Sequence, residues 1–419
     1  MPERLVFFGT SDLAGLVRGK SFPESDLESR LRRGVGITHS NLMLSAFGPI
    51  LATPFGTTGD LQLRVSPATR AIIPMQDGSE GLLYLGDFHT LEGAHWSHCP
   101  RGLLQRAAAS LKQISGLELR CAFEQEFVYS GVAEVAGAPY SLGAFRRQGG
   151  FGAALMGAIR ACDIEPDSFL AEYGPRQYEV TIGPTPALQA ADQAVVVREL
   201  IRAVAAQAGH SACLAPMITP EGVGSGTHIH FSLWNAHGQP VTLSPDGIHG
   251  LGPQAEAFVA GVLRELPALA AVTAPSPPSY LRLKPGRWAP SHGDLGVLDR
   301  GSALRICPVI KGTPESEARQ FNVEYRVADA TASPYLALGC VIAAGAEGIR
   351  AGLRLADAPP APLPQTLTEA LDHFEASAAA KGWFGAEFHD AYLMFKRAEV
   401  AAVASLSPQA LCDRYAEIY

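Results

Sequence analysis

Three segments of the sequence place two charged or ligand-type side chains two residues apart. The pairs are Glu124 with Glu126, His228 with His230, and Glu324 with Arg326. In a β-strand, residues i and i+2 point to the same face, so each segment is expected to present its pair on one side. The first two pairs lie among apolar neighbours, where adjacent carboxylates are costly unless a cation neutralises them. Three such pairs in one chain therefore predict a cation site rather than three unrelated solvated strand faces.

Two further glutamates, Glu172 and Glu179, lie in the segment EYGPRQYE. Five glutamates with one or two histidines suit a hard divalent ion, Mg²⁺ or Mn²⁺, better than zinc. The same chain also carries several arginines. Because metal ions bridge phosphate oxygens and arginine neutralises developing charge, phosphate chemistry is the natural use of such a set.

One basic segment, 279–309, contains a large aromatic ring among its cations. Its basic residues are Arg282, Lys284, Arg287, Arg300 and Arg305. Trp288 follows a Pro-Gly turn in the middle of this segment. The whole chain has a net charge of -8, which argues against general binding to nucleic acid or to anionic membranes. The local positive charge therefore predicts a small anionic ligand.

The elements that must position these residues fall into two regions. Residues 1 to about 95 are rich in Gly, Pro and Thr, and predict strands within 4–22, 59–67 and 81–88. From about residue 100, predicted strands (118–130, 226–235, 321–329) alternate with predicted helices (100–115, 185–208, 254–273, 333–356, 367–383 and 387–406). This pattern predicts an α+β protein with domains at 1–97 and 98–419.

Composition narrows the class of protein. With 419 residues, 47% of them hydrophobic and 18% charged, the chain is expected to be globular. Its seven cysteines are dispersed and form no CxxC pair, which argues against a disulfide framework and against a zinc site. The N-terminus shows no signal peptide, and the longest apolar run is too short to cross a bilayer. We expect a cytoplasmic protein.

The motifs, taken in order, resemble those of the glutamine synthetase family nearly from end to end. They are FGTSDLAGLVRGK, FEQEF, EYGPRQYE, GSGTHIHFSL, RLKPGRWAP, DRGSALRI and NVEYRVADATASPYLA. The resemblance implies a small N-terminal β-grasp domain followed by a large catalytic α/β domain. It also implies self-association into rings, expected to be dodecamers, with each active site between the N-terminal domain of one subunit and the catalytic domain of the next.

The resemblance also implies roles for individual residues. Two or three Mg²⁺ or Mn²⁺ ions are expected, one held by Glu126, Glu172 and Glu179 and a second by Glu124, His228 and Glu324. The expected ATP contacts are His230, Ser232, Arg300, Arg305 and Arg319. The expected contacts to glutamate and to the nitrogen substrate are Arg282, Arg326, Gly224, Trp288 and Thr38, and the residues expected to act at the reacting atoms are Arg300, Arg305, Arg326 and Trp288.

Two departures from the family pattern change the expected substrate. True glutamine synthetases carry a glutamate where this chain has Trp288, and an ammonium-binding aspartate close to the position of Thr38. No Asp or Glu occurs between Arg30 and Gly59. Because a desolvated ammonium ion needs carboxylates, the sequence resembles the members that make γ-glutamylamides from organic amines. Val223 also replaces an asparagine near the glutamate amino group, which leaves the acid substrate open.

Trp288 is expected to form an apolar or π-face wall for the amine, although the same residue could be a packing residue on a rigid loop. The base that accepts the amine proton is His39, His292 or Asp294, and the sequence does not choose among them. The predicted activity is an ATP-dependent ligase that joins glutamate to an organic amine through γ-glutamyl phosphate. One alternative is an ordinary glutamine synthetase that uses ammonium. Another is a catalytically silent ring-forming protein, and the retained metal ligands disfavour this second alternative.

Overall fold

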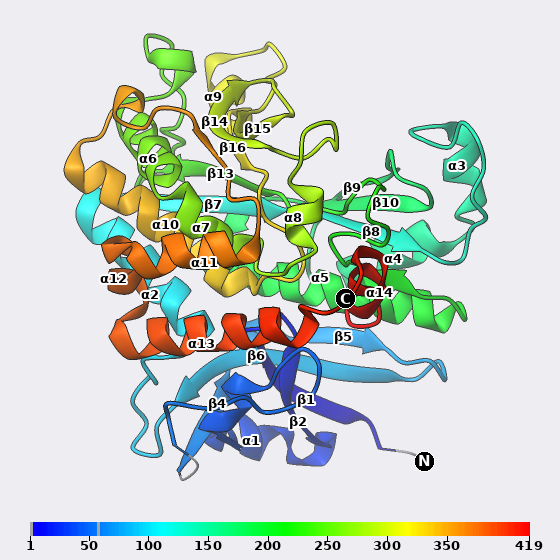
Figure 1. Cartoon of the computed structure of the whole chain (residues 1–419). Coiled ribbons are helices and arrows are strands. Elements are labelled where there is room, and N and C mark those ends of the chain that lie inside the picture. The colour runs from blue at the N-terminus through cyan, green and yellow to red at the C-terminus, as the bar shows by residue number, and fades with distance from the viewer. Residues whose placement is uncertain (1–2, 57–58) are drawn as a thin grey trace.

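The N-terminal region forms one mixed β-sheet. The computed structural model describes residues 3–56 and 59–419, and Figure 1 shows this sheet in blue at one end of the molecule. The strand order is β2-β1-β6-β4-β3, with β5 also paired to β6. The strands are β1 Leu5–Ser11, β2 Val17–Pro23, β3 Val35–Thr38, β4 Asp60–Val65, β5 Ala71–Pro74 and β6 Glu80–His89, and the helices are η1 Glu24–Asp26, α1 Leu27–Arg33, η2 His39–Met43 and η3 Pro67–Thr69.

Two sheets form the centre of the catalytic region. The larger has the order β11-β7-β13-β16-β15-β14-β17 and the smaller the order β12-β8-β10-β9. The strands are β7 Glu118–Phe123, β8 Gln125–Tyr129, β9 Pro166–Ala171, β10 Gln177–Ile182, β11 Thr185–Pro186, β12 Ala212–Cys213, β13 Ile229–Trp234, β14 His292–Val297, β15 Ser302–Ile306, β16 Val323–Tyr325 and β17 Ala361–Pro362.

The segment 118–130, predicted as one strand, is two strands that belong to different sheets. β7 pairs with β13, whereas β8 pairs with β10, and Glu124 is the residue between them. Buried and part-exposed residues nevertheless continue to alternate through the break, so Glu124 and Glu126 stay on one side. The prediction of a single strand was wrong, but the break places Glu124 where the two sheets meet.

Helices cover the catalytic sheets and enclose the core. They are α2 Pro100–Ser115, α3 Leu142–Arg147, α4 Phe151–Ala161, α5 Ala187–Gln207, η4 Ile248–Gly250, α6 Pro253–Arg264, α7 Leu266–Thr273, α8 Ser279–Arg282, α9 Pro314–Gln320, α10 Pro334–Ala351, η5 Leu355–Asp357, α11 Leu367–Ala376, α12 Ala378–Phe384, α13 Ala386–Val403 and α14 Pro408–Ala416. The segment 367–383, predicted as one helix, is broken at Ser377, which caps α12.

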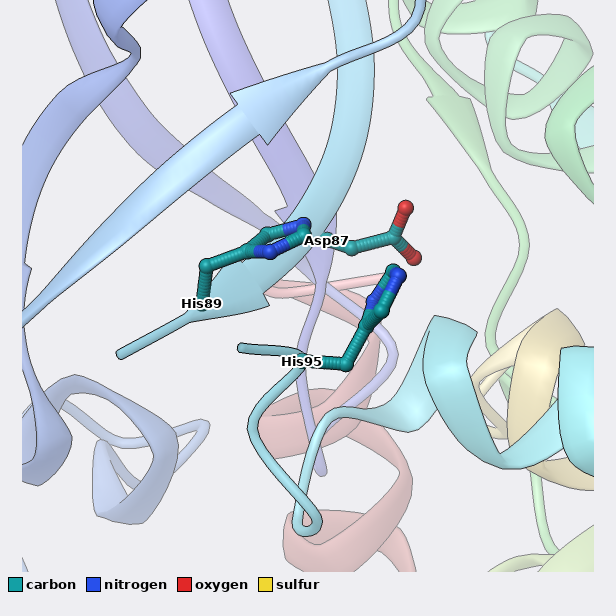
Figure 2. A group of neighbouring side chains, drawn as sticks. All are labelled: Asp87, His89 and His95. Atoms are coloured by element: carbon teal, nitrogen blue, oxygen red, sulfur yellow. The ribbon is translucent and has the colours of Figure 1, made fainter. Parts of the chain in front are cut away.

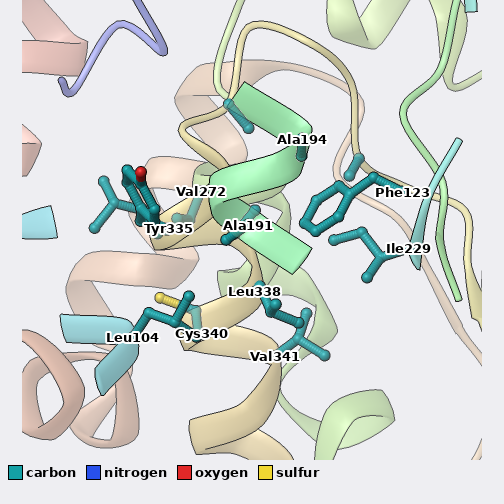
Figure 3. Close-up of a cluster of buried hydrophobic side chains, with 14 of the residues drawn as sticks. Leu104, Phe123, Ala191, Ala194, Ile229, Val272, Tyr335, Leu338, Cys340 and Val341 are labelled. Carbon is teal, nitrogen blue, oxygen red and sulfur yellow. The ribbon is translucent and has the colours of Figure 1, made fainter. Parts of the chain in front are cut away.

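Helix α10 lies at the centre of this core. Figure 3 shows Leu338 and Val341 of α10 among buried side chains from α2, α5, β7 and β13. Gly348 of α10 lies directly against α6, because a Cβ there would meet the Ala257 carbonyl oxygen at 2.1 Å. Glycine therefore permits the close approach of these two helices.

A buried ion network joins the N-terminal sheet to the catalytic helices. The Arg101 guanidinium on α2 donates to Asp87 on β6 at 2.7 Å and to Asp192 on α5 at 2.8 Å. The Tyr335 hydroxyl on α10 also donates to Asp192. Since ion pairs buried in this way need good geometry to offset desolvation, the network fixes how the sheet sits on the helices. No helix in the described part of the chain is long and apolar enough to cross a membrane.

Candidate active site

A cavity of about 400 Å³ lies where the two catalytic sheets meet. All six predicted metal ligands lie in or beside it, although they come from segments up to 200 residues apart (Glu124 to Glu324). Strand pairing places several of these side chains next to one another. Glu126 lies opposite Glu179 in the smaller sheet, and Glu324 lies between His230 and Arg305 in the larger sheet.

Three of the predicted ligands form a carboxylate cluster. Oxygen atoms of Glu126, Glu172 and Glu179 lie within 4.8 Å of one another. No described lysine or arginine forms an ion pair with any of the three. Burial, together with the negative charges of neighbouring carboxylates, raises the pKa of Glu179 well above its ordinary value, and burial raises that of Glu126. Acidic oxygens at this spacing, without a lysine or arginine ion-pair partner among the described residues, fit a hard divalent cation such as Mg²⁺ or Mn²⁺.

The second predicted set is also brought together, with one difference in grouping. His228 Nδ1 lies 3.0 Å from Glu124 Oε2 and 3.4 Å from Glu324 Oε1. Ligand atoms of Glu124, Glu179 and His228 lie within 4.8 Å of one another, so Glu179 joins both groups. Glu324 is instead ion-paired with Arg305 at 2.9 Å and with Arg326. These residues therefore fit two adjacent cations.

His230 contributes positive charge beside the second group. Its Nε2 lies 2.8 Å from Glu124 Oε1, and its Nδ1 donates to Asn322 Oδ1 at 2.9 Å. Burial lowers the pKa of His230, but the charge of Glu124 and the hydrogen bonds to Cys307 and Glu124 together outweigh that effect and raise the pKa well above its ordinary value. The pKa of its partner, Glu124, shifts in the opposite direction. Burial alone raises the pKa of Glu124, but His230 and His228 bring it well below its ordinary value.

The arginines of the cavity present unpaired donors to an anionic ligand. Arg282 is buried and donates through one terminal nitrogen to the carbonyl oxygens of Val327 and Ala328. The Nε atoms of Arg282 and Arg305 are buried without a hydrogen-bond partner among the described residues. Because an unpaired buried donor is costly, these two atoms fit carboxylate or phosphate oxygens. Arg300 is exposed at the same cavity.

A second cavity, of about 380 Å³, lies on the other side of the same carboxylates. Glu124 and Glu179 line both cavities. The predicted ATP contacts His230, Ser232 and Arg319 line the second. Ser232 Oγ accepts from Trp234 Nε1 at 2.9 Å, and Arg319 lies 5.5 Å from the centre of the Trp234 ring. The predicted ATP contacts are thus divided, since Arg300 and Arg305 line the first cavity.

The glycines before β13 bring the backbone close to the site. A Cβ on Gly224 would meet Arg282 Cγ at 2.5 Å, and one on Gly226 would meet His228 Nε2 at 2.7 Å. The Gly224 carbonyl oxygen accepts from Gln177 Nε2 at 2.9 Å, and the Gly226 N–H donates to Glu126 Oε2 at 2.6 Å. Only glycine fits at positions 224 and 226. The backbone N–H of Gly226 orients the carboxylate of Glu126, one of the predicted metal ligands.

Trp288 lies at the mouth of the first cavity. Its side chain is 58% exposed and its ring centre lies 5.8 Å from that of Tyr173. Its φ angle is +55°, a left-handed conformation that costs a bulky residue free energy. The Trp288 carbonyl oxygen accepts from Arg326, and Arg287 donates to the Gly222 carbonyl oxygen, so the loop is held at both points.

Some predicted residues lie away from this cavity. In the described chain, Thr38 does not line it and instead contacts Ser40 and Asn41 on the exposed end of β3. The three candidate bases, His39, His292 and Asp294, do not line it either.

Several residues of the site were not predicted from the sequence. Tyr140, Tyr173 and Gln177 line the cavity, and the Tyr140 hydroxyl donates to Glu172 at 2.7 Å. Cys307 is buried and lies 3.6 Å from His230. Gln177 and Tyr173 belong to the recognisable segment EYGPRQYE, so their position beside Glu172 and Glu179 was the available signal.

Comparison with known proteins agrees with this geometry. The family model described as "Glutamine synthetase N-terminal domain" matches residues 1–96, and "Glutamine synthetase, catalytic domain" matches residues 97–415. The gamma-glutamylpolyamine synthetase GlnA3 of Streptomyces coelicolor is 32% identical over 96% of this chain and 91% of its own length. The gamma-glutamylanilide synthase of an Acinetobacter species is 26% identical over 95% of this chain and 87% of its own length.

A solved structure described as a novel glutamine synthase homolog is 40% identical, covers 100% of this chain and 99% of that one, and superposes with a TM-score of 0.95. The fold is therefore that of glutamine synthetase, with its N-terminal and catalytic domains in the expected order. The chain belongs to the glutamine synthetase family of ATP-dependent ligases.

Proposed function

We propose that this enzyme joins the γ-carboxylate of glutamate to an organic amine, in an ATP-dependent reaction that yields a γ-glutamylamide. The observation that carries the proposal is the exposed Trp288 ring at the cavity mouth, beside Tyr173. Family members that use ammonium have a glutamate at the position of Trp288. The relatives that act on larger nitrogen substrates, a gamma-glutamylpolyamine synthetase and a gamma-glutamylanilide synthase, give independent support.

The arrangement of the two cavities supports a two-step reaction. With glutamate in the first cavity and ATP in the second, the γ-carboxylate oxygen attacks the terminal phosphorus and ADP leaves. The amine nitrogen then attacks the acyl carbon, phosphate leaves and the nitrogen loses a proton. Both ligands meet at Glu124 and Glu179, the residues that line both cavities. The protein contributes orientation and charge stabilisation rather than covalent chemistry.

Each group of residues has a role in this scheme. Arg282, with its unpaired buried Nε, binds the glutamate carboxylate, with Gly224 beside it. The groups that stabilise charge on the transferred phosphoryl group are Arg300, Arg305 and Arg326. The carboxylates Glu126, Glu172 and Glu179 hold one divalent ion, and Glu124 and His228, with Glu324 beside them, hold another. Such ions, when bound, neutralise phosphate charge and polarise its oxygens.

The rim of the cavity favours an amine with an apolar or aromatic body. Trp288, Tyr173 and Tyr140 supply aromatic surface, and Leu170 and Val223 add aliphatic surface. Aromatic faces attract an organic ammonium group, and the same rings exclude water from its carbon skeleton. We therefore propose a monoamine rather than a polyamine, since a polyamine would also need carboxylates at its distal end.

The position of Thr38 supports an oligomeric enzyme. Thr38 lies on the N-terminal sheet, exposed and outside the cavity of its own chain. We propose that the N-terminal domain of a neighbouring subunit completes each site, as in the family's rings. Light scattering coupled to size-exclusion chromatography tests this assembly.

An amine panel tests the substrate. Phosphate release is measured with glutamate, ATP and Mg²⁺ fixed, while the acceptor is ammonium, ethylamine, benzylamine, aniline or putrescine. The proposal predicts that a monoamine gives the highest kcat/KM and that the product is its γ-glutamylamide, identified by mass spectrometry. The highest kcat/KM with ammonium would refute the altered acceptor, and the highest value with putrescine would refute the monoamine class.

A further inference from the structure

A second group of metal-ligating side chains lies outside the active site, at the end of β6. Ligand atoms of Asp87, His89 and His95 lie within 4.8 Å of one another. Figure 2 shows Asp87 and His89 leaving β6 and His95 leaving the segment that leads to α2. We propose that these three residues form a site for a borderline divalent ion of the zinc class. Two histidines and one carboxylate are a frequent ligand set for such ions, with one position left for water.

The backbone pairing brings the three side chains together. Asp87 and His89 are two residues apart on β6, so they point to the same face. The chain then turns at Thr90 to Gly93, and an antiparallel bridge places His95 directly opposite His89. The two imidazole rings are 4.3 Å apart. Residues directly opposite each other in an antiparallel pair have the shortest side-chain separation across strands. The turn fixes this pairing of His89 and His95.

The carboxylate of Asp87 has one oxygen without a partner. Asp87 is only 8% exposed. Its Oδ2 accepts hydrogen bonds from Arg101 at 2.7 Å and from Gln105 at 3.3 Å. The other oxygen, Oδ1, is buried and has no hydrogen-bond partner among the described residues. A buried acceptor left unpaired is costly, so a ligand beside it stabilises the structure. Arg101 meanwhile orients the carboxylate, as outer hydrogen bonds do for metal ligands.

His89 is oriented in the same way. Its Nδ1 lies 3.3 Å from the Gly93 carbonyl oxygen. A carbonyl oxygen only accepts, so Nδ1 carries the hydrogen and the lone pair lies on Nε2, the nitrogen then available to a metal. His95 is exposed, so its ring is accessible to an ion from solvent. The three ligand atoms lie within 4.8 Å of one another. Bonds of about 2.0–2.2 Å to one ion require these atoms to move slightly closer together.

The charge around the group is compatible with a cation. Arg101 is shared by the two carboxylates of Asp87 and Asp192, so these three groups together carry one negative charge. Arg64 lies opposite Asp87 on β4, and its guanidinium donates to the Gln62 side-chain oxygen at 2.7 Å. A Cβ on Gly93 would meet a terminal nitrogen of Arg64 at 3.5 Å, so this second cation lies beside the turn and partly offsets the negative charge. An ion at this place would tie the hairpin to the network that joins the two domains.

Zinc retention by matched variants tests the site. Wild type, His95→Ala and the control His237→Ala are stripped with chelator, loaded with Zn²⁺ in a large excess of Mg²⁺, and dialysed. His237 is an exposed histidine in a distant turn, so the control removes an imidazole without touching the group. Zinc per chain is measured by mass spectrometry, and Zn²⁺ affinity by competition with a chromophoric chelator.

The expected result is one additional zinc ion in wild type and His237→Ala compared with His95→Ala, whose affinity for that ion is at least about tenfold weaker. Zinc is also expected to raise the thermal midpoint of the first two proteins more than that of His95→Ala, because it binds only the folded state. Equal zinc content in all three folded proteins would overturn the proposal, and active-site zinc does not affect the comparison, since no variant alters that site.

Discussion

The replacement Trp288→Gly separates the acceptor role of the ring from a packing role. A tryptophan side chain buries about 150–250 Å² when fully covered, and 58% of Trp288 is exposed. If an amine covers half of that exposed part, it removes about 45–70 Å² of apolar surface from water, worth about 1.1–1.8 kcal/mol at about 25 cal/mol per Å². The variant is therefore expected to lose about 6- to 20-fold in kcat/KM for the best organic amine.

Stability is expected to change little. The φ angle of +55° costs a bulky residue roughly 1–2 kcal/mol that glycine does not pay. Glycine in turn adds about 0.4–1 kcal/mol of unfolded-chain entropy. The two effects nearly cancel, so the thermal midpoint of Trp288→Gly is expected to stay the same or rise slightly. A packing residue would behave differently, since its removal lowers the free energy of unfolding.

The matched control is Leu298→Gly. Leu298 has a φ angle of +62° and is 56% exposed, close to the values of Trp288, but its side chain lines neither cavity. Stopped assays of phosphate release with ammonium and with the best organic amine are run on both variants. Trp288→Gly should lose activity only with the organic amine, and Leu298→Gly with neither. An equal loss with both nitrogen substrates in Trp288→Gly would refute the view that the ring binds the amine.

Three other substitutions test the predicted metal ligands, the proposed binding of the glutamate carboxylate, and the ion network between the two domains. Glu179→Gln should raise the thermal midpoint of chelator-treated protein and abolish its response to Mg²⁺. Because the pKa of Glu179 is raised in the folded state, the metal-free wild type should lose stability as pH rises above the ordinary glutamate pKa, and a pH series of midpoints should be flatter in this variant. Arg282→Lys loses a charge-assisted hydrogen bond worth about 1.5–3 kcal/mol, so steady-state kinetics should show roughly 10- to 150-fold lower kcat/KM for glutamate. Arg101→Ala leaves Asp87 and Asp192 buried without a cation, and denaturant unfolding should show a loss of about 3–5 kcal/mol.

The sequence predicted which side chains converge, because spacing within strands survives folding. Glu124 and Glu126 remain on one side although the strand between them breaks, since burial alternation continues across the break. The break itself was not predictable, because it depends on β7 pairing with β13 while β8 pairs with β10. Local periodicity carries no information about such long-range partners.

The contacts of Tyr140 show a second limit of sequence reasoning. Tyr140 lies in an irregular loop far in sequence from Glu172, yet its hydroxyl donates to that carboxylate. No motif marked it, and only the folded chain places it at the cavity. Tyr173 lies in a recognisable motif, but its contact with Trp288 was not predictable, since it joins two loops more than 100 residues apart.

The geometry is compatible with the proposed change of acceptor, because the rest of the site can stay the same. In the proposed reaction, the acid is activated beside Glu124 and Glu179, which line both cavities, with arginines on each side. Trp288 and Tyr173 lie at the outer rim, and the carbonyl oxygen of Trp288 accepts a hydrogen bond from Arg326 in the charged core. A backbone contact of this kind is available to any residue at position 288. Under the proposed function, the side chain there can therefore select the nitrogen substrate without disturbing phosphoryl transfer, provided that the loop keeps its left-handed turn.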